Sequence, residues 1–412
     1  MNQDYSIKDI LREGKASHVI MVILLFAFAN DGFDYINWGF KNFYVSHIMA
    51  FLFLVLWIIS KKSSQNLNFK NYVLAFAFIP FLSFYNAQNL YGQPLFKSVM
   101  AVSPSLIWLF YFLLPHWKIK ESSILKAFLF IALFIVGVQI IQQFTFPDVA
   151  FGVKTPDEIE AGQEIAEKRS GLWRFTIGNN AFYTAVILFA LWTGVKWKIR
   201  NVSVLIIGIL LISVYLTLTR QVLFSMVLTL LLSFFVGKDS INVRALVVGG
   251  ILFILLFKFS NLLFGDLIKM VGEDARKDYV RVLAANFFWN ETFQSIPTIY
   301  FGHGVARSDS FLQVQEKFQE VYHYYTTDVG FIGIMWHYGI IYVIACYDLL
   351  YSLFVKWREF IPTYIRLFVL FTGMMSVMIF PMNNPVSYLT WCFLLYICDT
   401  YINKGRPIVS KL

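Results

Sequence analysis

Charged residues are scarce in this sequence, and their scarcity argues against an ordinary soluble domain. Only 14% of the 412 residues are Asp, Glu, Lys or Arg, whereas soluble domains carry about 25%. Hydrophobic residues make up 58% of the chain, and its mean hydropathy is +0.63. The shortage of charge is explained if most of the protein surface faces lipid hydrocarbon instead of water.

Cysteine is also rare, and no cleavable leader is visible. The three cysteines, Cys346, Cys392 and Cys398, all fall inside apolar runs, so their pattern indicates neither a disulfide framework nor a metal site. Residues 1–17 have mixed charge, and the first apolar run lacks a small-residue cleavage site. We therefore expect that run to remain as a membrane anchor.

Long apolar runs are what the sequence has in abundance. A run of about 17–25 residues can span a bilayer as a helix. Together the runs predict an all-α polytopic integral membrane protein with about 12 transmembrane helices, forming a single transmembrane domain over residues 1–412. They lie at about 18–35, 43–60, 71–88, 94–114, 124–145, 177–195, 202–218, 221–236, 245–264, 327–354, 364–380 and 386–402.

The distribution of basic residues predicts the orientation of these spans. With the N-terminus inside, the seven inner segments hold 20 of the 34 lysines and arginines and six acidic residues; the outer segments hold the other 14 and 17 acidic residues. Basic inner segments are typical of bacterial membrane proteins, so both termini are expected in the cytoplasm. Nucleic-acid binding is not expected despite the net charge of +9, because it needs a contiguous basic patch.

Two outer segments are long, and both are expected to carry short interfacial helices. In the first, residues 146–176, a capping box from Thr155 to Glu158 predicts a helix that continues to about Lys168. In the second, residues 265–326, apolar residues recur at helical spacing. Those helices could lie in the membrane interface with their apolar faces down, or pack as a cap over the bundle. The recurring residues are Leu267, Ile268, Val271, Val280, Leu283, Ala284, Phe287 and Phe288.

The turn around Arg220 is unusually tight. Residues 202–236 must cross the membrane twice, which leaves almost no loop and holds Arg220 at, or slightly below, the outer membrane surface. A charge costs about 2.5–3.5 kcal/mol at the bilayer centre and less toward the interface. Such an arginine has an anionic partner or lines a wet cavity, the alternative being a side chain that snorkels to the headgroups.

Arg220 is one of four arginines expected where outer segments meet helices, the others being Arg169, Arg174 and Arg281. The planar guanidinium grips phosphate oxygens with two parallel hydrogen bonds. A cluster of arginines at the outer leaflet therefore indicates a lipid-linked phosphate or pyrophosphate ligand. For any single arginine, a surface ion pair is the competing interpretation.

Four outer residues can exchange protons or hold charge: His303, Asp309, His323 and Asp328. His323 or Asp328 could accept a proton from a hydroxyl nucleophile, and histidine is the residue type whose ordinary pKa lies nearest neutrality. The competing interpretations are that His323 is an interfacial residue among tyrosines and that Asp328 serves the helix dipole at the start of a span.

Several short pieces follow one another along the outer segments. Arg174 to Asn180 looks like an Arg…Gly…Asn segment that opens a span, and Thr219-Arg220-Gln221 looks like a Ser/Thr-Arg-Gly element. Arg281 precedes the turn Phe301-Gly302-His303-Gly304, and His323 with the run 328–333 closes the long loop. In this order and placement, the pieces resemble the bacterial O-antigen polymerase and O-antigen ligase superfamily of polytopic membrane glycosyltransferases.

The resemblance implies sugar transfer without a nucleotide donor. The donor would be a glycan on undecaprenyl pyrophosphate at the outer face of the inner membrane; a hydroxyl of an acceptor glycan attacks the anomeric carbon, and lipid pyrophosphate leaves. No cofactor and no metal are expected, because arginines can stabilise the leaving charge. The implied residues are Arg174, Arg220 and Arg281 for the pyrophosphate, His323 and Asp328 for catalysis, and Arg169, His303 and Asn179 as possible additional residues.

Within the superfamily, the sequence favours the polymerase of lipid-linked repeat units over the ligase that moves finished glycan to lipid A core. The short His323-Tyr324 variant and the run Asp328-Val329-Gly330-Phe331 are the reasons. Membrane lipids, a chain-length regulator and a flippase are the partners that such a polymerase implies. A transporter is the alternative of a different class, but transporters place ionisable residues near the membrane midplane, where this sequence has almost none.

Overall fold

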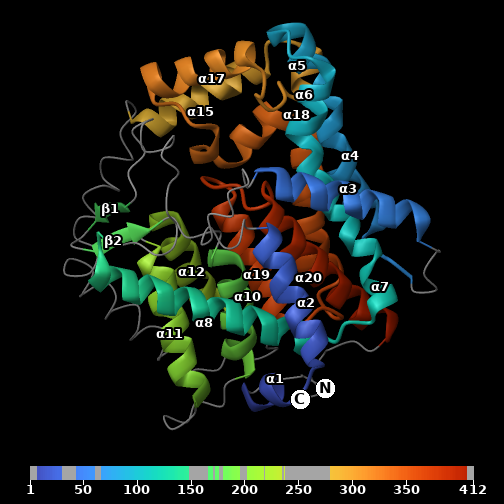
Figure 1. Ribbon diagram of the computed structural model, residues 1–412, viewed down its shortest axis with the longest axis vertical. Coiled ribbons are helices and arrows are strands. Elements are labelled where there is room, and N and C mark those ends of the chain that lie inside the picture. Colours follow the sequence, from blue (N-terminus) through green and yellow to red (C-terminus); the bar gives the residue numbers. More distant parts are fainter. Residues whose placement is uncertain are drawn as a thin grey trace.

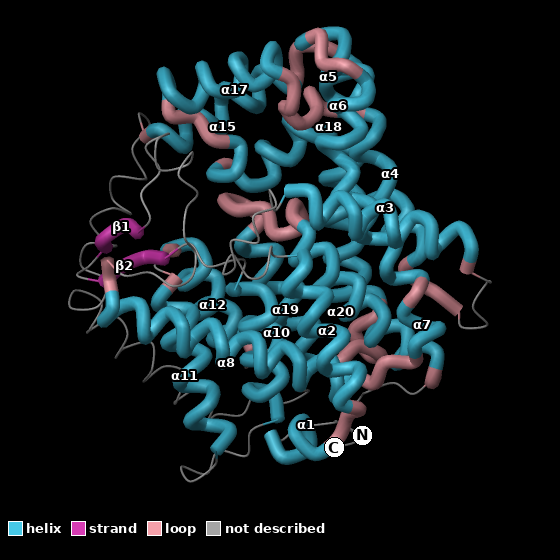
Figure 2. Tube along the Cα trace, in the orientation of Figure 1, coloured by secondary structure: helices cyan, strands magenta, loops and turns pink. Residues whose placement is uncertain are grey.

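The computed structural model describes residues 7–29, 43–60, 66–147, 166–169, 172–175, 180–194, 202–217, 219–233, 236 and 279–405. Within these residues almost every element is a helix, and the remaining regular structure is one two-stranded sheet (Figures 1 and 2). The expected all-α class is therefore confirmed.

Helices occupy the apolar runs of the described chain. Four helical stretches are long and apolar enough to cross a membrane, namely Lys70–Tyr91, Leu95–Phe112, Glu121–Thr145 and Gly330–Lys356. The structure thus describes a membrane protein, while the total of about twelve spans stays a prediction and the run at 245–264 lies outside the described residues. The helices are α1 (Ile7–Arg12), α2 (Ala16–Ala29), α3 (Phe43–Ile59), α4 (Lys70–Leu82), α5 (Phe84–Tyr91), α6 (Leu95–Val102), the 3-10 helix η1 (Ser103–Phe112), α7 (Leu114–Trp117), α8 (Glu121–Thr145), α10 (Asn180–Gly194), α11 (Val202–Leu216), α12 (Arg220–Leu232), α18 (Gly330–Tyr351), the π-helix η3 (Ser352–Lys356), α19 (Thr363–Met375) and α20 (Pro385–Asn403).

The last helix, α20, lies at the centre of the bundle. Every residue from Val386 to Asp399 is buried, and α20 packs against η1, α2 and α10. Aromatic rings fill the contacts: Phe393 stacks on Phe26 at 6.0 Å between ring centroids, and Trp391 meets Phe368 at 5.2 Å. A helix that is apolar on all sides has no solvent face, which explains why it occupies the middle of the bundle.

The described part of the second long segment, from residue 279 on, forms a helical cap, shown at the top of Figure 1. We call residues 279–328 the cap; it contains α15 (Val280–Thr292), α16 (Ile296–Phe301), α17 (Asp309–Tyr322) and the 3-10 turn η2 (Thr326–Asp328). The helix expected around Val280 is thus present. Its buried residues Ala284 and Phe288 face α18, where Phe288 meets Trp336 at 5.4 Å. Of the two arrangements expected, α15 adopts the cap packed over the bundle.

The first long outer segment departs from the expected helix. Residues Ala166–Arg169 form strand β1, which pairs antiparallel with β2, Leu172–Phe175. The expectation of helix is therefore wrong for residues 166–168, and its earlier part lies outside the described residues. A tertiary contact accompanies the strand: both backbone polar groups of Trp173 bond to the side-chain amide of Gln143 on α8, at 2.9 and 2.6 Å. A capping box indicates only that the local sequence favours a helix. Strand pairing and tertiary contacts override that local preference here.

Candidate active site

The cap is docked on α18 through two glycines. Gly339 interrupts α18 with φ 79°, and Gly302 ends α16 with φ 68°. A Cβ on Gly339 would lie 2.0 Å from the carbonyl oxygen of Tyr300, and a Cβ on Gly302 would lie 2.4 Å from the backbone of His337. Both the positive φ and the close approach therefore require glycine at each position.

Backbone hydrogen bonds complete this docking. The amide of His303 donates to the carbonyl of Trp336 at 2.6 Å, and the amide of Gly304 donates to the carbonyl of His337 at 3.0 Å. In an uninterrupted α-helix those two carbonyls would accept from residues four positions later. The kink at Gly339 interrupts that ladder, and the turn at residues 301–304 supplies the missing donors.

The ring of His303 is buried, with 2% exposure, and both nitrogens are engaged. Nε2 donates to the carbonyl of Glu291 at 3.2 Å, so Nδ1 accepts from the hydroxyl of Tyr91 at 2.7 Å. The ring also stacks on Trp336 at 5.0 Å. Burial lowers the pKa of His303 to about 4, which keeps the ring neutral near neutral pH. His303 thus ties α5, α15 and α18 together, as a structural histidine does.

A second histidine links the docked turn to η2. His337 of α18 donates through Nδ1 to the carbonyl of Gly304 at 2.9 Å and accepts through Nε2 from the hydroxyl of Thr326 at 3.1 Å. Gly333 lies on the same face of α18, where a Cβ would be 1.9 Å from the Thr326 carbonyl. The position of η2, which ends at Asp328, is thus set by α18.

Arg281 and Asp328 lie together in the structure. They come from opposite ends of the cap, Arg281 from the first turn of α15 and Asp328 from η2, and form an ion pair with Nη2 and Oδ2 3.6 Å apart. Their side chains are 28% and 42% exposed. One of the predicted pyrophosphate-binding residues and one of the predicted catalytic residues therefore meet at a surface that a ligand can reach.

The other titratable residues expected at the site lie at the two ends of α17. His323 ends the helix with φ 55°, a left-handed conformation typical of helix C-termini, and its side chain is exposed. The next residue, Tyr324, packs against Phe287 of α15 at 5.6 Å. Asp309 begins α17 and pairs with Lys97 at 3.8 Å on the surface, whereas Asp328 pairs with Arg281.

For the remaining predicted arginines, the structure describes the position of the backbone. Arg169 ends β1, and Arg174 lies in β2, paired in register with Glu167. Because Trp173 is bonded to Gln143, the backbone next to Arg174 is anchored on the C-terminal end of α8. Arg220 is the first residue of α12, as the tight turn predicts. Asn179 lies outside the described residues.

Sequence reasoning missed a polar network beside the cap. Gln93, fully buried, donates to the carbonyl of Val305 at 3.0 Å and accepts from the amides of Arg307 and Ser308 at 2.7 and 2.9 Å. Nη1 of Arg307 donates to Nε2 of His47 on α3 at 3.1 Å. The available signal was the presence of single polar residues, His47 and His337, within apolar runs, where polar groups are costly unless paired.

A narrow cavity opens beside this site. It is lined by Thr326, Thr327, Gly330, His337 and Asn383, together with two apolar residues. The first two belong to η2, adjacent in sequence to Asp328. The cavity has a volume of about 20 Å³, which is room for about one water molecule, so its hydroxyl, amide and imidazole groups surround a space smaller than a sugar ring.

No protein-family model matches the chain, and no curated protein matches its sequence. Among the described residues, no three histidines, cysteines or acidic residues come together as a metal site. Fold and site define the class directly: a helical membrane protein whose bundle carries a packed polar cap with an accessible arginine–aspartate pair.

Proposed function

We propose that this protein is a glycosyltransferase that polymerises undecaprenyl-pyrophosphate-linked oligosaccharide repeat units at the outer face of a bacterial inner membrane. The observation that carries the proposal is the 3.6 Å contact between Arg281 and Asp328. The resemblance to O-antigen polymerases assigns these two residues to pyrophosphate binding and to catalysis, and the fold brings them together from the two ends of the cap.

In the proposed reaction, a hydroxyl of the acceptor glycan attacks the anomeric carbon of the donor. The bond between that carbon and the pyrophosphate oxygen breaks, the hydroxyl proton passes to a base of the protein, and undecaprenyl pyrophosphate leaves. Arg281, with Arg174 and Arg220, would stabilise the negative charge that develops on the leaving group. Arginine suits this task because it stays charged and binds two phosphate oxygens at once.

The geometry of the ion pair supports an exchange of partners. A half-exposed pair at 3.6 Å contributes little to stability, about 1 kcal/mol or less. An incoming pyrophosphate carries more negative charge than a carboxylate and can take over the Arg281 guanidinium. Donor binding would then release Asp328 next to the reacting hydroxyl, where it can support His323 or accept the proton itself.

The first experiment tests the pyrophosphate role. Purified protein is given a synthetic lipid-linked repeat unit, and polymer is resolved by gel. Arg281→Ala should lower the rate by about 10²–10³, the usual effect of losing one donor to a developing oxyanion, and Arg281→Lys should also fail. Arg358, an exposed arginine in a predicted inner segment, provides the control substitution Arg358→Lys. Full activity of Arg281→Lys would exclude bidentate binding by Arg281.

The second experiment separates the two candidates for the base. His323→Ala should lower the rate by about 10²–10⁴ while donor binding persists, and Asp328→Asn should be milder. If Asp328→Asn forms no polymer while His323→Ala remains active, Asp328 is the base. Full turnover by both variants would place the base elsewhere in the outer segments.

The third experiment separates polymerase from ligase and from transporter. A deletion strain that makes lipopolysaccharide with a single repeat unit has lost a polymerase, whereas accumulated lipid-linked polymer with uncapped core indicates a lost ligase. Polymer formed by the purified protein in detergent, without a membrane barrier, would exclude a transporter as the sole function.

We also propose that both termini face the cytoplasm. The basic inner segments support the cytoplasmic side. Polar contacts between distant segments support the grouping of these segments, because they join ends that the charge pattern assigns to the same side. Asn68 donates twice to Asp399 near two inner ends, and Gln143 bonds to Trp173 near two outer positions. A reporter fused after Ser410 that is active only in the periplasm would overturn the topology and the site assignment with it.

A further inference from the structure

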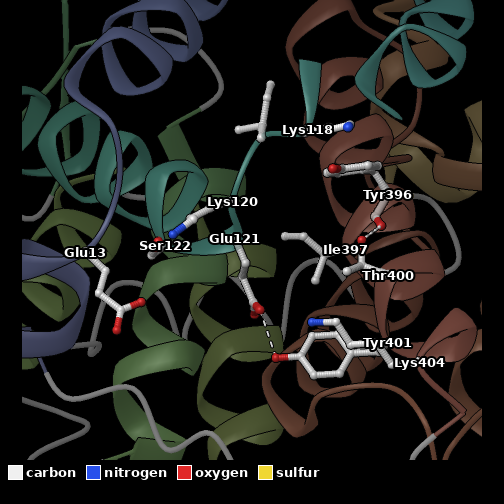
Figure 3. A pocket seen from close by; sticks show the side chains of 11 residues that line it. Glu13, Lys118, Lys120, Glu121, Ser122, Tyr396, Ile397, Thr400, Tyr401 and Lys404 are labelled. Atoms are coloured by element: carbon white, nitrogen blue, oxygen red, sulfur yellow. Dashed lines mark hydrogen bonds between the residues drawn. The ribbon is translucent and has the colours of Figure 1, made fainter. Parts of the chain in front are cut away.

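A cavity of about 340 Å³ lies at the ends of helices that the charge pattern places on the inner side of the membrane (Figure 3). Three segments form it: the junction of α7 and α8, the C-terminal end of α20, and Glu13 from the segment between α1 and α2. Its volume falls within the range of about 300–1,000 Å³ that is typical of small-molecule sites. Nothing in the proposed glycosyl transfer uses this cavity.

Three lysines border the cavity from two separate segments. Lys118 and Lys120 precede α8, and Lys404 follows α20; all three are exposed. Lys118 adopts a left-handed conformation, φ 47°, at the end of α7. Lysines separated along the chain by almost 300 residues are thus gathered around one opening, opposed at the rim by the carboxylate of Glu13.

The second carboxylate of the cavity, Glu121, has its oxygens engaged by the protein. Oε1 accepts from the hydroxyl of Tyr364 at 2.7 Å, and Oε2 accepts from the hydroxyl of Tyr401 at 2.8 Å. Figure 3 shows the carboxylate pointing at Tyr401. These bonds join α8, α19 and α20, so Glu121 holds the cavity wall together. The lysines are therefore the principal charges offered to a ligand.

The rest of the lining is amphipathic. Ile119 and Ile397 are buried in the wall, with 3% and 1% exposure, and the rings of Tyr396 and Tyr401 also line the cavity. Hydroxyls of Ser122 and Thr400 complete the lining. An apolar wall under a cationic rim suits a molecule with an anionic head and a hydrocarbon body.

We propose that this cavity binds the phosphate headgroup of an anionic phospholipid in the inner leaflet. The inner leaflet is negatively charged, and basic pockets between membrane helices on that side recognise lipid phosphates. Lysine binds phosphate as a point charge without a fixed geometry, which fits three flexible cations around a fluid headgroup. The proposal rests on the inner placement of these helix ends and is independent of the glycosyltransferase proposal.

The test compares binding of phosphatidylglycerol and phosphatidylcholine to the purified full-length protein in neutral detergent, by native mass spectrometry. Phosphatidylglycerol should bind at least about tenfold more tightly. The triple variant Lys118→Gln, Lys120→Gln, Lys404→Gln should lose that preference. A control with the same charge change outside the cavity, Lys70→Gln, Lys356→Gln, Arg358→Gln, should keep it within about twofold.

Glu13→Gln provides a variant that should gain affinity, because it removes the opposing charge from the rim; about two- to fivefold tighter binding is expected from an exposed charge. This gain keeps the proposal testable if the triple variant fails to fold. Arg281→Ala should bind phosphatidylglycerol as the unchanged protein does, whatever its effect on polymer, so the two proposals fail separately.

Three results would overturn the proposal: no preference for phosphatidylglycerol, equal losses in the cavity and control triples, or unchanged binding by Glu13→Gln together with the cavity triple. Competition with inorganic phosphate tests whether the cavity instead recognises a soluble ligand. If free phosphate binds in the cavity and displaces phosphatidylglycerol completely at about equal concentration, the site recognises free phosphate and the lipid assignment is wrong. If phosphatidylglycerol resists it, the lipid assignment stands.

Discussion

The bundle and the cap are held together by different forces. Most contacts around α20 are apolar and aromatic, and residues from Val386 to Asp399 are buried without interruption. The polar contacts of Asp399 with Asn68 and of Tyr401 with Glu121 lie at its C-terminal end. The cap is joined to α18 and α5 by directional bonds: the amides of His303 and Gly304, the ring of His337, and Asn86, which donates to the carbonyls of Pro297 and Gly302 at 2.9 and 2.6 Å.

This difference indicates where single substitutions should matter. Packing energy in the bundle is spread over many weak contacts, so one small change removes a small share of it. The cap depends on a few close approaches and buried hydrogen bonds, and each buried group that loses its partner costs about 1–3 kcal/mol. We therefore expect the cap to detach before the bundle unfolds.

The largest expected effect comes from the glycine at the kink. Gly339→Ala places a Cβ 2.0 Å from the Tyr300 carbonyl at a φ of 79°, so stability should fall by about 3 kcal/mol or more. The matched change in the bundle is Gly373→Ala on α19, where a Cβ meets nothing within 4 Å; it should be neutral or slightly stabilising. Thermal unfolding in detergent measures both. Equal effects of the two changes would contradict the distinction between cap and bundle.

The second largest loss of stability is expected from removal of the buried side-chain amide of Gln93. Gln93→Ala leaves the amides of Arg307 and Ser308 without their side-chain acceptor, at a cost of about 2–3 kcal/mol. Gln88 on α5 is exposed, so Gln88→Ala should change stability by less than about 0.5 kcal/mol. Hydrogen exchange in residues 305–311 should increase in the first variant alone; exchange that rises equally in α20 would show that cap and bundle unfold together.

Acid should weaken the cap through His303. Its pKa is about 4 in the folded protein and 6.5 ordinarily, so between these values the unfolded chain binds a proton that the folded one does not. Stability is then lost as pH falls from about 6.5 to 4, by about 1–3 kcal/mol. Burial raises the pKa of Glu291 and acts in the opposite direction, so Glu291→Gln should steepen the loss.

Hydrogen exchange of the cap, corrected for the intrinsic effect of pH, measures this dependence. His303→Gln should make this dependence shallower, because glutamine does not titrate. If the pH dependence of hydrogen exchange in the cap is as steep in His303→Gln as in the unchanged protein, a group other than His303 causes the acid sensitivity.

The smallest effect on stability is expected at the candidate site. Asp328→Asn removes a half-exposed ion pair with Arg281, and stability should change by less than about 1 kcal/mol. The same variant should lower polymer formation measurably. A functional loss without a stability loss would separate this pair from Gln93 and Gly339, whereas a large stability loss would make the pair part of the cap's docking.

The contrast between the regions also explains how far the sequence could be interpreted. The helical spacing of Ala284 and Phe288 predicts the helix at Val280, and the structure buries both side chains. The strand at residues 166–168 escapes the same reasoning, because it pairs with the neighbouring β2 while Trp173 is anchored on Gln143, a residue distant along the chain. For the site, the sequence predicted Arg281 and Asp328 separately, without the contact between them.

The sequence by itself determined that this chain is helical, apolar and built to lie in a membrane, because hydropathy and helical period are local properties of consecutive residues. It also placed Arg220 at the start of a helix after a tight turn. Only the tertiary structure decided that Gly302 approaches the backbone of His337 and Gly339 that of Tyr300, that His337 sets the position of η2, and that three lysines from the ends of α7 and α20 border one cavity. Those contacts depend on how helices far apart in the chain pack, and no local pattern encodes that packing.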